Sequence, residues 1–161
     1  MLIRKTTIEE IPMLMEIYSR ARAFMKASGN ETQWGDNYPA LSLITADVEA
    51  GNSYVCLHKD KIVGTFYFAV ENDTSYGQIY NGAWKNEKEY AVVHRVAVDQ
   101  KGLGVASFCL NWAYEQYPNV KIDTHKNNIA MQKTLEKNGF AYCGEIKLAD
   151  GSERIAYQHC E

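Results

Sequence analysis

The sequence predicts a mixed α+β fold, in which a central, mostly antiparallel, twisted sheet of about seven strands is flanked by about four helices. Two observations predict it. β-rich segments alternate with segments that keep the apolar spacing of helices. The order is a strand, two helices, three antiparallel strands, then helix, strand and helix, and a final hairpin. This order requires a mixed sheet with helices on its faces.

Seven segments are predicted to be strands. A short connection at 59–61 joins two of them as an antiparallel hairpin, and Asp150-Gly151 is a hairpin signal for the last two. The strands are Leu2 to Lys5, Ser53 to His58, Lys61 to Val70, Tyr90 to Val98, Val120 to Thr124, Phe140 to Ile146 and Arg154 to His159.

Four segments are predicted to be helices. Thr7 and Glu10 form a capping-box signature for the first, Pro118 ends the third and Gly139 ends the fourth. The helices are Ile8 to about Met25, Leu41 to Ala50, about Val105 to Tyr117, and Ile129 to Lys137. The polar segment Ser28 to Pro39 is expected to be a loop that contacts the substrate.

Length and composition indicate a single domain over residues 1–161. Hydrophobic residues make up 46% of the chain and charged residues 23%, a mixture that supports a sizeable core. The 17 Lys and Arg against 20 Asp and Glu give a net charge of -3. Such a balance provides no general attraction for nucleic acid or anionic lipid, so neither is expected as a partner.

The cysteines and the N-terminal sequence predict a cytoplasmic protein without a metal site. No Cys-x-x-Cys spacing occurs, and no histidine lies at zinc-finger distance. The scattered thiols are expected to be free: Cys56, Cys109, Cys143 and Cys160. The chain also has neither the apolar region of a signal peptide nor an apolar run of membrane-spanning length.

A glycine-containing segment, 101–106, lies between the fourth strand and the third helix. Gly102 and Gly104 allow a tight turn and a close approach of the backbone to a ligand. The loop amides, the helix N-terminus and Lys101 together suit a diphosphate. A plain strand-to-helix turn is the alternative. The segment lacks the third glycine of a dinucleotide fingerprint, no P-loop occurs in the chain, and its position argues against a nicotinamide enzyme.

The motifs around this loop resemble those of the GNAT superfamily of N-acetyltransferases. The family pattern is Arg/Gln-x-x-Gly-x-Gly/Ala between a strand and a helix, and lysine replaces its first residue here. The order of elements agrees over nearly the whole chain, with specific motifs from about Tyr90 to Phe140. The matching segments are His94 to Val98, Lys101-x-x-Gly104-x-Ala106, Asn128-x-x-Met131 and Gly139-Phe140.

The resemblance implies that the chain uses acetyl-CoA. Strands four and five would be parallel and splayed, and the pantetheine arm would pair with strand four. The backbone N–H of Val96 or its neighbour would hold the thioester carbonyl and stabilise the oxyanion. Asn128 would contact the cofactor, cap its helix, or do both. The expected cofactor contacts are Val96, Ala97, Val98, Lys101, Gly102, Leu103, Gly104, Val105, Ala106, Ser107, Asn128, Met131 and Leu135.

Proton transfer is expected to involve His94. An alkylammonium must lose a proton before it attacks, and His94 stands where the family often has a glutamate on strand four. By alternation His94 shares a face with Val92 and Val96, unless a bulge breaks the parity. A hydrogen-bonded histidine packed under the sheet is the alternative interpretation. Glu71 and Glu89 are the other candidates for the base.

The general acid of the family does not carry over. Many members have a tyrosine in the helix before Gly-Phe, and this chain has Leu135 there. Tyr142 is the expected substitute. A coenzyme A thiolate, whose thiol pKa is about 8.5, leaves tolerably without an acid.

The acceptor is expected to be a small-molecule or peptide amine. Aromatic residues of two segments either line its pocket or pack at the surface: Trp34, Tyr38, Tyr80 and Trp84. The resulting hypothesis is acetyl transfer to a primary amine by direct attack in a ternary complex. A non-catalytic acyl-CoA sensor is the alternative, and a different nucleotide-phosphate enzyme is a third. The edge of the final hairpin could pair two copies as a homodimer.

Overall fold

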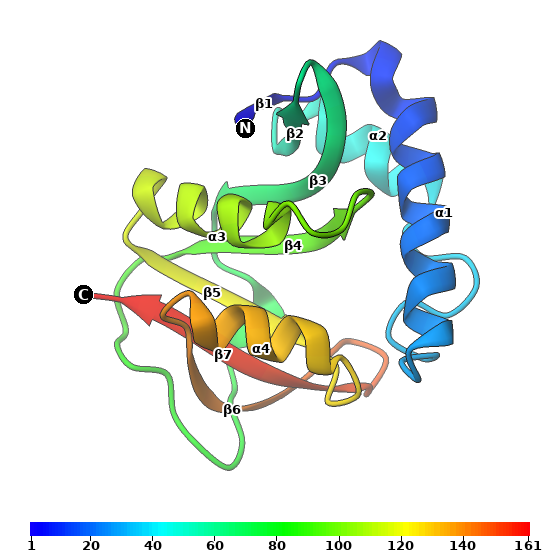
Figure 1. Cartoon of the computed structure of the whole chain (residues 1–161). Coiled ribbons are helices and arrows are strands. Elements are labelled where there is room, and N and C mark those ends of the chain that lie inside the picture. Colours follow the sequence, from blue (N-terminus) through cyan, green and yellow to red (C-terminus); the bar gives the residue numbers. More distant parts are fainter.

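The computed structural model describes residues 1–161 as a seven-stranded sheet between two pairs of helices (Figure 1). The strand order is β1-β2-β3-β4-β5-β7-β6, and only β4 and β5 are parallel neighbours. The strands are β1 Leu2–Lys5, β2 Ser53–His58, β3 Lys61–Val70, β4 Ala91–Val98, β5 Asn119–Thr124, β6 Ala141–Lys147 and β7 Glu153–Cys160. The predicted mixed α+β fold is therefore confirmed.

Four α-helices and two short 3-10 helices connect the strands. They are η1 Ile8–Glu10, α1 Ile11–Ala27, α2 Leu41–Glu49, η2 Thr74–Tyr76, α3 Val105–Gln116 and α4 Ile129–Lys137. The sequence predicted neither 3-10 helix. The first follows from its capping box, since the Thr7 backbone N–H donates to the Glu10 carboxylate at 2.8 Å, and Pro12 then starts α1.

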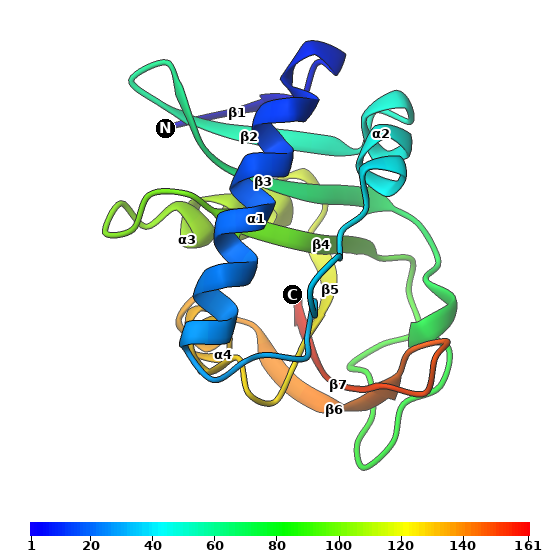
Figure 2. The same cartoon turned by 90° about the vertical axis from the view of Figure 1, so that its right-hand side faces the viewer.

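The helices cover opposite faces of the sheet in pairs. Figure 2 shows α1 crossing the strands on one face, and α1 and α2 pack there around Leu14, Ile44 and Val55. On the other face, α3 and α4 contribute Leu110 and Leu135 to the largest buried cluster. Successive strand residues alternate between these faces, which we call the α1/α2 face and the α3/α4 face.

The sheet opens between β4 and β5. Only Ala91 with Val120 and Val92 with Lys121 are paired, after which the two strands diverge (Figure 1). From Val93 onward β4 has no strand neighbour on the β5 side. The parallel, splayed arrangement implied by the family resemblance is therefore present.

A bulge in β4 lies beside this gap. Tyr67 pairs with His94 and Thr65 with Ala97, so two residues, Arg95 and Val96, lie opposite one residue of β3. Arg95 has a φ of 53°, which is unusual for a side chain of its size. The bulge reverses the alternation of side chains along the rest of the strand.

The edge of β6 is not free for pairing at its centre. The Tyr80 and Glu145 backbones exchange two hydrogen bonds of 2.8 Å, and the Ala83 N–H donates to the Cys143 carbonyl at 2.9 Å. The expected pairing of two copies at this edge thus lacks backbone donors and acceptors at these positions, because the chain's own 80–83 segment uses them.

All four cysteines are free thiols, as expected from their spacing. No helix of the chain combines the length and the apolar character needed to span a bilayer.

Candidate active site

A cavity of about 520 Å³ lies at the β4–β5 gap. Residues from both faces of the sheet line it, so it passes through the sheet where the two strands diverge. Its lining residues are Met25, Thr32, Gln33, Trp34, Gly35, Tyr38, Asp73, Ser75, Val93, His94, Arg95, Val96, Ile122, Asp123, Thr124, Asn128, Met131, Leu148, Asp150, Ser152 and Arg154. Two molecules that approach from opposite faces can therefore meet in it.

The glycine loop adopts the conformation that its sequence predicted. Gly102 and Gly104 have φ values of 84° and 70°, and Gly104 is the N-cap of α3. A Cβ built at either glycine meets no heavy atom within 4 Å, so the space beside the loop is open. Positive φ angles of this size favour glycine at both positions. The absence of side chains also leaves room for a ligand at the first amides of α3. Lys101 lies with its Nζ 3.3 Å from the centre of the Phe24 ring.

Asn128 caps α4 and links it to the loop that follows α1. Its Oδ1 accepts from the Met131 backbone N–H at 3.1 Å, and its Nδ2 donates to Gln33 Oε1, also at 3.1 Å. The cap interpretation of Asn128 is therefore confirmed. The link to Gln33 was not predicted, because it joins residues far apart in the sequence.

The other residues expected at the cofactor take different positions. Met131 and Val96 line the cavity, whereas Val105 and Leu135 are buried in the core. Ala97 is buried with α1 and α2 on the opposite face. The remaining residues of the set belong to the loop, the end of β4 or the first turn of α3: Val98, Leu103, Ala106 and Ser107.

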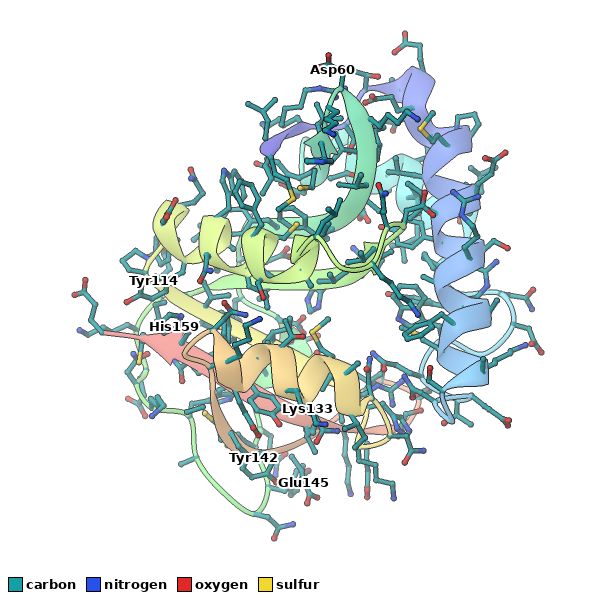
Figure 3. All side chains as sticks on the ribbon, in the orientation of Figure 1. Asp60, Tyr114, Lys133, Tyr142, Glu145 and His159 are labelled. Carbon is teal, nitrogen blue, oxygen red and sulfur yellow. The ribbon has the colours of Figure 1, made fainter.

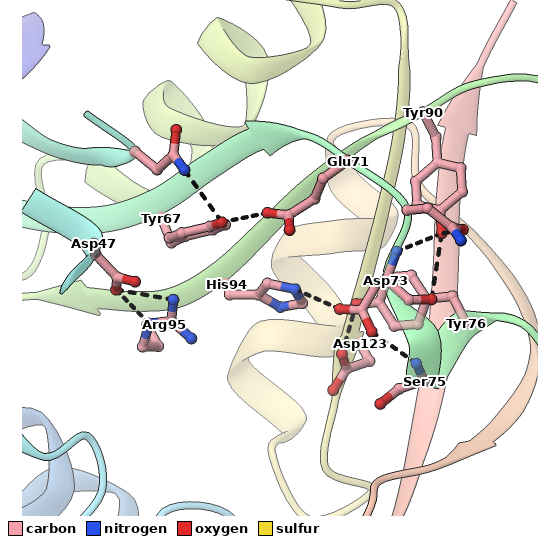
Figure 4. Close-up of polar contacts among 12 residues, drawn as sticks. Asp47, Tyr67, Glu71, Asp73, Ser75, Tyr76, Tyr90, His94, Arg95 and Asp123 are labelled. Atoms are coloured by element: carbon pink, nitrogen blue, oxygen red, sulfur yellow. Dashed lines mark hydrogen bonds and ion pairs between the residues drawn. The ribbon is translucent and has the colours of Figure 1, made fainter. Parts of the chain in front are cut away.

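His94 lies in the cavity on the α1/α2 face, held by Asp73 (Figure 4). The distance from His94 Nε2 to Asp73 Oδ2 is 2.9 Å. Asp73 is itself fixed at the start of η2, where its Oδ1 accepts from the Ser75 N–H at 2.8 Å. Next to this pair, the Tyr76 hydroxyl donates to Asp123 Oδ2 at 2.6 Å.

The bulge separates His94 from Val96. His94 shares its face with Val92 and lies near the Tyr67 and Tyr76 rings, whereas Val96 packs on the α3/α4 face. The expectation that all three share one face is wrong for Val96, because the extra residue of the bulge shifts the alternation by one. The His94 and Val96 side chains therefore approach the gap from opposite sides.

The two carboxyls of this group differ in acidity. Burial acts to raise the pKa of Asp73, but the hydrogen bonds from His94 and Ser75 outweigh it and hold the pKa below its usual value. Burial raises the pKa of Asp123, although the His94 and Arg154 charges and the Tyr76 hydroxyl oppose it. The cavity thus holds one carboxyl that favours the charged form and one that resists it.

Arg95 connects Asp47 to Tyr38 at the cavity. Its guanidinium forms a buried ion pair with Asp47 at 2.9 Å and donates to the Tyr38 hydroxyl at 3.1 Å. Trp34 packs between Tyr18 and Tyr38. Trp34 and Tyr38 both line the cavity, as the sequence predicted for acceptor contacts.

Three other predicted site residues do not reach the cavity. Tyr142 is 52% exposed, packs on the Tyr157 ring and lies at the outer side of β6 (Figure 3). Trp84 donates to the Tyr76 carbonyl at 2.9 Å, and Tyr80 pairs with β6. These aromatic residues instead hold the 80–84 segment against the sheet.

The two glutamates considered as alternatives to His94 are also outside the cavity. Glu71 accepts a hydrogen bond from the Tyr67 hydroxyl, and Glu89 accepts one from the Tyr117 hydroxyl at 2.9 Å. His94 is the predicted base that the structure brings to the gap.

A family model described as the acetyltransferase (GNAT) family matches residues 11–140. The chain belongs to this family. The match includes the glycine loop, the bulged strand and the Asn128 helix, and it ends at Phe140. No functionally curated protein matches the chain.

Solved structures of GNAT acetyltransferases share the whole fold. One from Streptococcus agalactiae is 30% identical, covers 99% of this chain and 95% of its own, and superposes with a TM-score of 0.92. A ribosomal-protein-alanine N-acetyltransferase from Brucella melitensis is 18% identical, with both chains covered completely (100%) and a TM-score of 0.68. A putative acetyltransferase from Salmonella typhimurium, solved with its cofactor acetyl-CoA, is 15% identical over 98% and 91% of the two chains, with a TM-score of 0.65.

Sequence reasoning missed three side chains of this GNAT site: Asp73, Asp123 and Arg154. Asp73 lies in a polar loop, and its contact with His94 spans 21 positions of the sequence. Asp123 lies within strand β5, and Arg154 lies in the closing hairpin. The Asp-x-Ser pattern at 73–75 was the one local signal, since it favours a capped turn.

Proposed function

We propose that this chain transfers the acetyl group of acetyl-CoA to a primary amine, which attacks directly while both substrates are bound. The observation that carries the proposal is the cavity through the sheet at the β4–β5 gap. It joins Ile122, Thr124 and Met131 on the α3/α4 face to a histidine–aspartate pair on the α1/α2 face. Transfer between two bound molecules needs such a meeting point.

The α3/α4 face suits acetyl-CoA, which supplies an acetyl group activated as a thioester. The free amides at the start of α3 and the open space at Gly102 and Gly104 would hold the diphosphate. The unpaired edge of β4 would bind the pantetheine arm, with backbone N–H groups of the bulge near the acetyl carbonyl. Acetyl-CoA in the Salmonella relative supports this assignment.

A further group on this face supports a bound ligand in the gap. The Thr124 hydroxyl is buried without a hydrogen-bond partner, although the residue lines the cavity. It shares the α3/α4 face with Ile122 and Val120 by alternation along β5. A polar group of the pantetheine arm would satisfy it.

His94 would accept the proton of the attacking ammonium. When Nε2–H donates to Asp73, Nδ1 is left as the acceptor, and the Asp73 carboxylate fixes the orientation of the ring. The amine nitrogen bonds to the acetyl carbon, the carbon–sulfur bond breaks, and the second proton lost by the nitrogen passes to the departing thiolate to give the coenzyme A thiol. Tyr142 lies outside the cavity, so the thiolate leaves without it.

The proposal is tested by the release of coenzyme A thiol from acetyl-CoA across a panel of amines, with calorimetry of acetyl-CoA binding alongside. The account expects binding and release that depends on the amine. Binding without release by any amine would favour the acyl-CoA sensor instead. The four free thiols support a reducing compartment, and we include a cytoplasmic location in the proposal.

A further inference from the structure

Arg154 of β7 is a buried cation without an acidic partner. The residue is 8% exposed and lines the cavity. Its guanidinium donates to the Glu153 carbonyl at 2.8 Å and to the Gln33 carbonyl at 3.0 Å. A guanidinium has five N–H donors. Two hydrogen bonds therefore leave three donors without a partner in the protein, at a residue that lines the cavity.

Three of the other four arginines form an ion pair with a carboxylate. Arg4 pairs with Glu10, Arg20 with Asp99, and Arg95 with Asp47, all within 2.9 Å. Arg22 is only partly buried. Arg154 thus combines burial with the lack of a carboxylate within ion-pair distance.

The acids nearest to Arg154 are engaged elsewhere. Asp123 accepts from the Tyr76 hydroxyl at 2.6 Å, and Asp150 accepts from the Ser152 backbone N–H at 2.9 Å. Burial also raises the pKa of Asp123, which weakens it as a counter-ion. The positive charge of Arg154 is therefore left for a group that enters the cavity.

Arg154 lies on the same face as the proposed base. Asp123 pairs with Ala156, so Arg154, two residues along β7, shares the α1/α2 face with Asp123. His94 lies on that face of β4. The cavity thus has the proposed base, two carboxyls and a cation on one face of the sheet.

We propose that Arg154 binds an anionic oxygen group of the acceptor, a carboxylate or a phosphate, and that the acceptor is a small amine with such an acid at its other end. This inference rests on the proposed function, because it names the class of acceptor. A planar guanidinium matches both acids through paired N–H donors. The acid at Arg154 would orient the amine toward His94.

A series of candidate acceptors of increasing length tests the proposal. Straight-chain amino acids from glycine to 6-aminohexanoate are compared with alkylamines that lack the carboxylate, and phosphoethanolamine tests phosphate. Acetyl-CoA thiol release gives kcat/KM, and saturation-transfer NMR with coenzyme A present gives binding without turnover. The acid-bearing compounds that fit the spacing should exceed their alkylamine partners by about 10- to 100-fold, the range of a charge-assisted hydrogen bond.

Variants locate the effect. Arg154→Gln should lower kcat/KM for acid-bearing acceptors by about 10- to 100-fold, mainly through KM, and leave the alkylamines unchanged. Arg154→Lys should keep part of the preference, because it retains the charge without the planar donors. Arg4→Gln, on the far edge strand β1, is the matched control and should keep the wild-type preference.

The outcomes separate the two proposals. Three results would overturn the Arg154 assignment. The wild type could have equal kcat/KM for acid-bearing acceptors and alkylamines, or Arg154→Gln could lower kcat/KM equally for both classes. The third is that no acid-bearing compound binds. Arg154-dependent binding of acids without any thiol release would retain it and overturn acetyl transfer. If Arg154→Gln does not fold, the assignment is tested by the acceptor series with the wild type and with Arg154→Lys.

Discussion

The two sides of the proposed active site are built in different ways. The proposed cofactor side consists of backbone atoms from a single stretch of chain, the loop 101–106 and the first turn of α3. The proposed acceptor side consists of side chains from separate segments: Tyr38, Asp47, Asp73, His94, Arg95, Asp123 and Arg154. Backbone geometry tolerates many sequences, whereas a chamber of side chains can change its ligand with each substitution. The difference explains how one fold can keep its cofactor and vary its acceptor.

The largest expected effect is on the cofactor side. Gly104→Glu should lower coenzyme A affinity about 1000-fold, because a like charge about 4 Å from a phosphate costs about 4 kcal/mol at an effective dielectric of about 20. Gly104→Ala is the control. Its Cβ meets open space and its strain is about 1 kcal/mol, so it should keep most of the affinity. Calorimetry measures both, and equal affinity for Gly104→Glu and wild type would remove the diphosphate from this loop.

The next largest effect is on stability, through the buried ion pair of the acceptor side. Asp47→Ala should reduce the free energy of unfolding by about 3 kcal/mol, since it leaves the Arg95 charge buried without its partner. Asp99→Ala removes the exposed partner of Arg20 and should cost less than about 1 kcal/mol. Urea unfolding compares them, and similar small losses would show that the Arg95 pair does not support the chamber.

A smaller effect separates chemistry from binding. His94→Ala should lower kcat about 100-fold and alter its pH dependence, with coenzyme A affinity unchanged, because the histidine lines the cavity on the proposed acceptor side. His58→Ala, at the end of β2, should match the wild type. An unaltered pH profile of kcat in His94→Ala would place the proton acceptor elsewhere.

The difference between the cofactor side and the acceptor side also determined how much the sequence could predict. Apart from the start of α1, which lies three residues after its predicted position, the helices and strands lie within one or two residues of their predicted bounds, because apolar periodicity, caps and turn residues are local signals. Gly102 and Gly104 were identified for the same reason. The bulge at Arg95 was not, since it reflects a mismatch in pairing with β3, and Asp73 and Arg154 act through contacts made only in the folded chain. Local signals and the family resemblance predicted the cofactor side, whereas tertiary structure was needed to find Asp73, Asp123 and Arg154 on the acceptor side.

The smallest expected effect is on how protein stability changes with pH at Asp123. Its folded pKa is raised, so the folded state binds this proton more tightly than the unfolded state, and the stability it provides is lost as pH rises above the unfolded value. Asp123→Asn keeps an acceptor for Tyr76 without the charge. Urea midpoints should therefore show a gain over wild type that grows from pH 4 to pH 8. A gain that is constant with pH would contradict the burial effect.

The central claim is that the cofactor and the acceptor meet in the β4–β5 gap, and a crystal structure with coenzyme A tests it most directly. The account predicts the diphosphate on the backbone amides of residues 102–106 and the thiol sulfur in the gap, between Val96 of β4 and Thr124 of β5, on the side of the cavity opposite His94. A diphosphate bound away from this loop, or a sulfur atom outside the gap, would contradict it.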